Sequence, residues 1–183
     1  FKKLKEDLLA KYNVDSVDDL PVNFRGVVAQ YSEGRQAKVL NEFAEKRMGE
    51  ELEQAHIARQ FGWLSPTVAV RAISTILAGT SLETHHRFLK EAEALRLEFV
   101  QGLNKVHVAK LDYTLDMNRN ASEEAADKAV VGADNWALLS EFSFKPEAAN
   151  TRISNALIYF LQLFVWVCIT ALLLKAAVRR LNP

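Results

Sequence analysis

The uncharged stretch Ala156–Leu174, ALIYFLQLFVWVCITALLL, decides the fold. As an α-helix with a rise of 1.5 Å per residue it would be ~28 Å long, close to the ~30 Å hydrocarbon core of a bilayer. Its only polar residues are Gln162 and Thr170, which a helix bundle can satisfy. Buried helices of soluble proteins seldom run this long without a charge. The stretch therefore predicts a membrane-spanning helix.

The cations around this stretch predict its orientation. Lys175, Arg179 and Arg180 follow it with no acidic residue among them, whereas Lys145 and Arg152 before it are mixed with acidic residues. Lysine and arginine concentrate on the cytoplasmic side of membrane helices. We therefore expect the C-terminus in the cytoplasm, with Arg179 and Arg180 as membrane anchors.

The rest of the chain has the character of a helical domain. Only 7 glycines and 4 prolines occur among 183 residues, which favours long helices over many short strands. We expect an all-α protein with an extracytoplasmic helical domain, residues 1–150, and a transmembrane helix with a short cytoplasmic tail, residues 151–183. The chain begins at Phe1 with no signal peptide, which indicates a segment of a longer chain.

Composition and missing motifs exclude several classes of function. The 23 Lys and Arg balance the 23 Asp and Glu, so no basic excess points to nucleic acid. The single cysteine, Cys168, lies inside the apolar stretch, a poor place for a reactive thiolate. The sequence contains no GxxxxGK[ST] phosphate loop, no G-x-S-x-G elbow and no H-E-x-x-H zinc motif. We expect neither catalysis nor a cofactor in this chain.

Apolar periodicity predicts the helices of the domain. A short helix covers Lys2–Tyr12, and a long one runs from Asn23 to the Gly62–Pro66 segment with a kink or local break near Gly34. A second long helix runs from Leu82 to about Val106. Two long helices with a short helix between them predict an antiparallel hairpin.

The short helix between the long ones, Pro66–Ala78, has strong end signals. Ser65 offers an N-cap, Pro66 suits the first helical position, and Gly79 suits the C-terminal cap. The helix is almost wholly apolar but too short to span a membrane, so it is either a core helix or a helix lying at the membrane surface. We expect structural roles for Pro66, Gly79 and Trp63.

The sequence after Asn118 gives weaker signals. A short helix is predicted from Ser122 to about Val130, followed by a loop over residues 132–150. Three aromatic residues in this loop are expected to fold back onto the helices, namely Trp136, Phe142 and Phe144.

Two Glu-x-x-His pairs raise the question of a metal site. Glu53 precedes His56, and Glu83 precedes His86, on separate predicted helices. Residues three apart share a helix face, and two such pairs with further carboxylates build di-iron sites in helical bundles. Glutamate is abundant here, however, so chance explains the pairs better, and we expect structural histidines and no metal.

Several short blocks follow one another along the chain: Ser16–Gly26 (SVDDLPVNFRG), Leu64-Ser65-Pro66, Arg71, Ser74, Leu77–Thr80 (LAGT), His85 or His86 with Phe88-Leu89, Phe142–Glu147 (FSFKPE) and Arg179-Arg180-Leu181. Taken in this order, they resemble the C-terminal part of a permease subunit of bacterial ABC transporters of the type-2, export-like class.

This resemblance implies the loop between the last two membrane helices of a multi-pass protein of the bacterial inner membrane, followed by the last helix. It implies a separate cytoplasmic subunit that binds and hydrolyses ATP, and a second permease subunit, identical or different. The loop domain would gate the outer mouth of the transporter or dock a partner. Two alternatives remain open from the residues: an extracytoplasmic sensor with one anchor, and a membrane-anchored di-iron protein.

Overall fold

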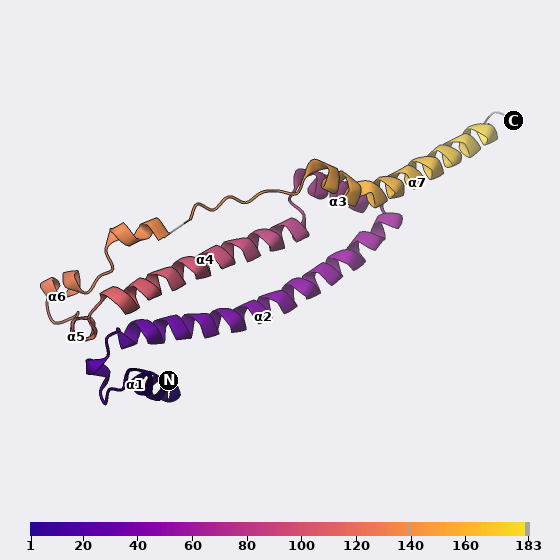
Figure 1. Ribbon diagram of the computed structural model, residues 1–183. Helices are drawn as coiled ribbons and strands as arrows, with labels where there is room; N and C mark the ends of the chain where they lie inside the picture. Colours follow the sequence, from indigo (N-terminus) through magenta and orange to yellow (C-terminus); the bar gives the residue numbers. More distant parts are fainter. Residues whose placement is uncertain (139, 182–183) are drawn as a thin grey trace. The chain divides into compact units, whose positions relative to one another are not determined.

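The computed structural model describes residues 1–138 and 140–181 and is all-α over them (Figure 1). Long packed helices precede one apolar helix, α7, that is long and apolar enough to cross a membrane. The prediction of fold class is confirmed. The elements are α1 (Lys2–Tyr12), η1 (Val17–Asp19), α2 (Phe24–Gln60), η2 (Phe61–Trp63), α3 (Pro66–Ala78), α4 (Leu82–Lys110), α5 (Tyr113–Met117), α6 (Glu123–Lys128), η3 (Ala133–Leu138) and α7 (Ala149–Leu181).

The chain divides into two compact units. The first unit comprises Phe1–Phe43 and Ala92–Phe142, and the second comprises Ala44–Glu91 and the chain from Ser143 onward. Helices α2 and α4 each contribute to both units. The predicted boundary at residue 150 separates a helical domain from a membrane helix. The two compact units instead divide α2 and α4 between them, so they do not test that boundary.

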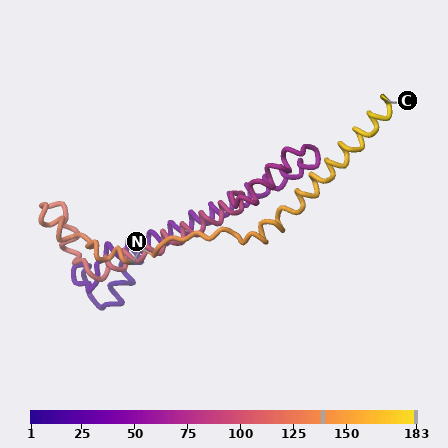
Figure 2. The backbone as a smooth tube through the Cα atoms, turned by 90° about the horizontal axis from the view of Figure 1, so that it is seen from above, coloured from indigo at the N-terminus to yellow at the C-terminus, as the bar shows by residue number. Residues whose placement is uncertain are grey.

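Helices α2 and α4 pair in antiparallel fashion within each unit (Figure 1 and Figure 2). In the first unit, Arg96 Nη2 on α4 donates to Glu33 Oε1 on α2 at 2.8 Å. In the second unit, Lys90 Nζ lies 3.3 Å from Glu45 Oε1. Partners that come later in α2 come earlier in α4, which is the pattern of the predicted hairpin.

Of the kink or local break predicted near Gly34, the break is wrong, because α2 is one 37-residue helix. A glycine inside a helix costs only about 1 kcal/mol relative to alanine. Neighbouring contacts with α4 offset that cost: Gln101 Nε2 donates to the carbonyl of Gln30 at 3.0 Å, and Arg96 pairs with Glu33. Packing against α4 therefore outweighs local propensity.

The ends of α3 follow the sequence signals. Pro66 occupies its first turn, and Gly79 ends it with a φ of 70° in the left-handed region. Glycine adopts this conformation at the least cost because it has no Cβ atom. The amides of Gly79 and Thr80 then donate to the carbonyls of Ile76 and Thr75. Ser65 is extended as an N-cap residue, but its side chain makes no capping hydrogen bond.

The segment after α4 is more helical than predicted. Asp112 caps α5 by accepting from the Leu115 amide at 3.0 Å, and Ser122 caps α6 by accepting from the Ala125 amide at 3.1 Å. Trp136 in η3 is 66% exposed, so the expectation that it folds back onto the helices is wrong.

Candidate functional site

The second unit is organised around the contact between α3 and the first part of α7. The side chains of Ala69, Ala72, Ile73 and Ile76 on α3 are buried, and Ala156 on α7 is fully buried. Small residues allow two helix backbones to approach closely, which favours tight packing in a membrane environment. We call this contact the α3–α7 junction.

The two ends of the junction show that α3 and α7 run antiparallel. At one end, Arg152 Nη1 on α7 donates to the carbonyl of Leu77 at the end of α3, at 2.5 Å. At the other end, η2 just before α3 meets α7, because Trp166 Nε1 donates to the carbonyl of Gly62 at 3.3 Å. Cations near a helix C-terminus interact favourably with the helix dipole. The Arg152 guanidinium lies in this position at the C-terminal end of α3.

Gly62 lies directly against the side chain of Gln162 on α7. A Cβ atom at Gly62 would lie 2.2 Å from Gln162 Oε1. Gln162 is only 2% exposed although it lies in the uncharged stretch of α7, and among the described residues its Oε1 has no hydrogen-bond partner. Polar residues inside membrane helices usually face other protein and carry a role. Gly62 therefore makes room for the amide that faces it.

The loop before α7 is held against α4. The Phe144 ring packs edge to face on Phe88, with ring centroids 5.5 Å apart, and the Arg87 guanidinium lies 4.7 Å from the centre of the Phe144 ring. Arg87 also donates to the carbonyl of Lys145 at 2.6 Å. The expectation that Phe144 folds back onto the helices is confirmed.

The four residues of the possible metal site do not come together as a ligand set. Glu83 pairs with Arg59, at 2.5 Å, and not with a histidine. The carboxylate that faces buried His86 belongs to Glu51, at 2.8 Å from Nε2, and not to Glu53. His56 Nε2 lies 3.4 Å from Gln60 Nε2. Within residues 1–138 and 140–181, no group of three or more His, Cys, Asp or Glu could hold a metal ion.

The ion pair between Glu83 and Arg59 joins the start of α4 to the end of α2. The hydrogen bond from Arg59 lowers the pKa of Glu83 to about 2, although partial burial opposes this shift. Because the folded-state pKa lies below the usual value, the pair stabilises the fold above about pH 4.5. That stabilisation is lost as the pH falls toward 2.

This ion pair gives a pH prediction. The melting temperature of Glu83→Gln should lie below that of the wild type at pH 7, and the difference should shrink as the pH is lowered from 4.5 toward 2. Circular dichroism of the detergent-solubilised protein measures it, with Glu53→Gln, an exposed glutamate of α2, as the matched control. A difference between Glu83→Gln and the wild type that stays constant with pH would contradict the assignment.

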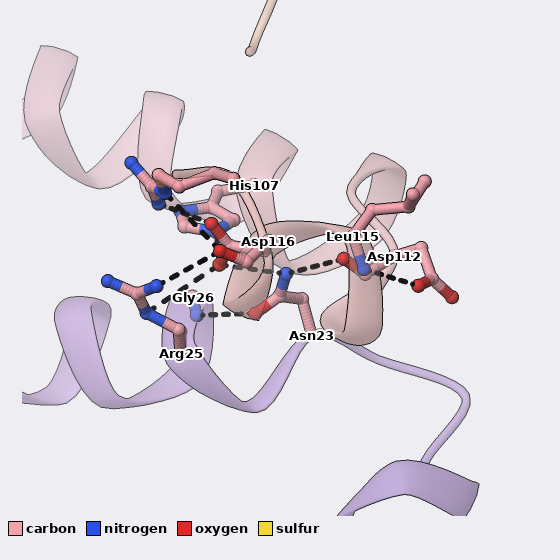
Figure 3. A network of polar contacts seen from close by, with 8 residues as sticks. Asn23, Arg25, Gly26, His107, Asp112, Leu115 and Asp116 are labelled. Carbon is pink, nitrogen blue, oxygen red and sulfur yellow. Dashed lines mark hydrogen bonds and ion pairs between the residues drawn. The ribbon is translucent and has the colours of Figure 1, made fainter. Parts of the chain in front are cut away.

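The first unit holds a buried polar network around Asp116, a residue that no sequence motif indicated (Figure 3). Asp116 on α5 is fully buried and accepts from Asn23 Nδ2 at 3.2 Å. His107 Nε2 lies 2.9 Å from Asp116 Oδ2, and since a carboxylate only accepts, the histidine donates. Arg119 donates to the other carboxylate oxygen, and Arg25 completes the set at 3.8 Å. We call these five residues the Asp116 network.

The Asp116 network has the electrostatics of a structural centre. Burial alone raises the pKa of the Asp116 carboxyl, but hydrogen bonds from His107, Arg119 and Asn23 outweigh it and lower that pKa below its usual value. The carboxylate is thus ionised and surrounded by donors. Asn23 also accepts from the amide of Gly26 through its Oδ1, at 3.1 Å, so the network fixes the start of α2.

The comparison with known protein families decides the classification. A family described as "Domain of unknown function (DUF3526)" matches residues 1–145. The chain belongs to this family. The DUF3526 match contains the Asp116 network, α3 and the Phe144 loop, and it stops before α7 begins at Ala149. No curated protein and no solved structure gives a significant match to this DUF3526 member.

Proposed function

We propose that the chain is the extracytoplasmic domain and the following membrane helix of a permease subunit of a bacterial ABC transporter. The observation that carries the proposal is the convergence of separate sequence blocks on one structural element. The blocks that resemble such permeases are spread along the chain from Ser16 to Leu181, yet four of them meet at or beside the α3–α7 junction.

Each of these blocks has a defined place in the second unit. The Leu64-Ser65-Pro66 block starts α3. The Leu77–Thr80 block ends it, where a Cβ atom at Gly79 would lie 3.4 Å from Arg152 and 4.0 Å from Pro146 of the Phe142–Glu147 block. Phe88 of the Phe88-Leu89 block packs on Phe144. The blocks thus join the loop domain to the helix that enters the membrane.

The proposed mechanism follows from the packing at the α3–α7 junction. In such a transporter, a cytoplasmic subunit hydrolyses ATP and moves the membrane helices against those of a second permease subunit. Motion of α7 would reach the extracytoplasmic domain through α3, because the packed helices and the Arg152 and Gly62 contacts move together. The domain would then gate the outer mouth or present a docking surface. The protein would lie in the bacterial inner membrane as a multi-pass chain, with residues 1–150 outside the cytoplasm.

Cysteine accessibility tests the topology. In the full-length protein with Cys168→Ser, Ala126→Cys on α6 should react with a membrane-impermeant maleimide in intact spheroplasts. Leu181→Cys at the end of α7 should react only after lysis. A permeant maleimide gives the matched control for both positions. Labelling of the two positions from the same side would rule out α7 as a span and the permease assignment with it.

Co-purification tests the function itself. An affinity-tagged full-length protein, solubilised in mild detergent, should bring down a cytoplasmic ATP-binding subunit with ATPase activity. Arg152→Met, which removes the hydrogen bond to Leu77, should retain that subunit but weaken the coupling between ATP hydrolysis and transport. A protein purified without any ATP-binding subunit under these conditions would contradict the proposal.

A further inference from the structure

The connection between α2 and α3 exposes large apolar side chains. Phe61 is 54% exposed, Trp63 43% and Leu64 73%, whereas Gly62 between them is buried against Gln162. We call Phe61–Leu64 the apolar tip. No Asp, Glu, Lys or Arg occurs from Gln60 to Val70. Exposed apolar patches of this kind mark contact sites for another protein or for a membrane.

The tip is fixed at a defined level along α7. Gly62 contacts Gln162 and accepts from Trp166. Both α7 residues belong to the uncharged stretch that starts at Ala156. Because α3 runs antiparallel to α7, its start and the apolar tip lie level with the interior of this stretch, while its end lies level with Arg152.

A charged pair of the same unit interacts with Tyr159 of α7. Arg59 and Glu83 form an ion pair, and Tyr159 of α7 adds to the rise in the pKa of Arg59 that Glu83 causes. The level of Tyr159 on α7 is therefore a polar one. Gln162 and Trp166 lie three and seven residues further along α7, which is roughly 5–10 Å at 1.5 Å per residue. Interfacial helices insert their apolar faces to a depth of about 5–10 Å.

Several backbone groups of the tip have hydrogen-bond partners within the protein. In the hydrocarbon region every backbone polar group needs a partner within the protein. The amides of Leu64 and Ser65 both donate to the carbonyl of Phe61 at 2.9 Å, and the carbonyl of Gly62 accepts from Trp166. These backbone groups therefore need no water when the tip lies in the hydrocarbon region.

We infer that the apolar tip inserts into the outer leaflet of the bilayer beside α7, with lipid acyl chains as its partner. The inference rests on α7 crossing the membrane, as in the proposed function, and adds a second point at which the domain holds the bilayer. Phe61 and Leu64 enter the acyl region, and Trp63 lies at the interface, where its ring is favoured. Arg71, the first charge after the tip, lies about 7.5 Å back along α3 from Pro66, close to the polar level of Arg59.

Fluorescence quenching in vesicles tests the inference. The full-length protein with Cys168→Ser is reconstituted into vesicles of phosphatidylcholine and phosphatidylglycerol. A bimane label is placed at Leu64→Cys in the tip or, as the matched control on the same helix pair, at Leu77→Cys near Arg152. A third variant, Phe164→Cys on the exposed face of α7, reports the span. Quenchers are iodide in water and doxyl-labelled lipid in the bilayer.

The expected result is that the label at position 64 is quenched by doxyl lipid and is several-fold less sensitive to iodide than the label at position 77. Iodide quenching at position 64 equal to that at 77 would overturn the inference. Protection of position 64 from both quenchers would also overturn it, because a partner protein or a second copy would then cover the tip. In both cases, quenching of the label at position 164 by doxyl lipid would still support α7 as a membrane span. If doxyl lipid does not quench the label at position 164, both the proposed span and this inference are wrong.

Discussion

Replacing Asp116 by alanine is expected to lower the free energy of unfolding of the first unit by about 3 kcal/mol. The carboxylate is fully buried and holds Asn23, His107 and Arg119. Its removal leaves the buried Asn23 side-chain amide with only its long hydrogen bond to the Asp112 carbonyl, at 3.5 Å, and leaves His107 without its carboxylate partner. Such under-satisfied groups cost about 1–3 kcal/mol each. Arg25 and Arg119 are 44% and 39% exposed, so water compensates for part of their loss.

Hydrogen exchange followed by mass spectrometry measures this effect in the detergent-solubilised protein. Protection should fall for the start of α2 and the end of α4, which the network joins. Asp116→Asn should show a smaller loss, because the amide oxygen still accepts one hydrogen bond but the charge is gone. Asp127→Ala on α6, an exposed aspartate, is the control. Equal protection in Asp116→Ala and Asp127→Ala would show that the network contributes little to stability.

The second large effect is expected from Gly26→Ala, at about 2 kcal/mol of destabilisation. A Cβ atom at Gly26 would lie 2.8 Å from the amide nitrogen of Val108 and 3.1 Å from its Cα. These are backbone atoms of α4, which cannot rotate away as a side-chain end can. The two helices must separate. The hydrogen bond from the backbone amide of Asn23 to the Val108 carbonyl, at 3.0 Å, then lengthens.

Gly49 provides the matched control for this substitution. It lies in the same helix, but nothing comes within 4 Å of the position of its Cβ. Gly49→Ala should therefore stabilise α2, by up to about 1 kcal/mol, because alanine is the better helix former. Chemical denaturation followed by circular dichroism compares the two variants. Shifts of the same sign would contradict the close approach of α2 and α4 at Gly26.

Much of the fold could be predicted because its signals are local. The bounds of α1 and α3 follow from apolar periodicity, Pro66 and Gly79, and the apolar helix follows from the length of its uncharged stretch. The continuity of α2 through Gly34 could not be predicted, because it depends on Arg96 and Gln101 of α4, which lie far away in the sequence. Local propensity is a weak prior when such contacts exist.

The candidate site was harder to predict than the fold. Asp116 lies in a stretch without clear periodicity, and its partner Asn23 is 93 residues away. The one signal in the sequence was the Ser16–Gly26 block, which contains Asn23 and Arg25 of the network. The Glu-x-x-His spacing assigned Glu83 to His86, whereas the structure pairs His86 with Glu51 and Glu83 with Arg59. Helical spacing shows which residues share a face, but not which face meets the neighbouring helix.

The burial of α3 against α7 has a consequence for how the protein is made. The ribosome completes α3 at Ala78 well before it begins α7 at Ala149, and at about 5–20 residues per second the interval lasts seconds. During that time Ala69, Ile73 and Ile76 have no α7 to cover them. The nascent helix must be sheltered by the lipid surface, the insertion machinery or a chaperone. Biogenesis, more than the finished fold, is then the stage at which this unit is most open to aggregation and proteolysis.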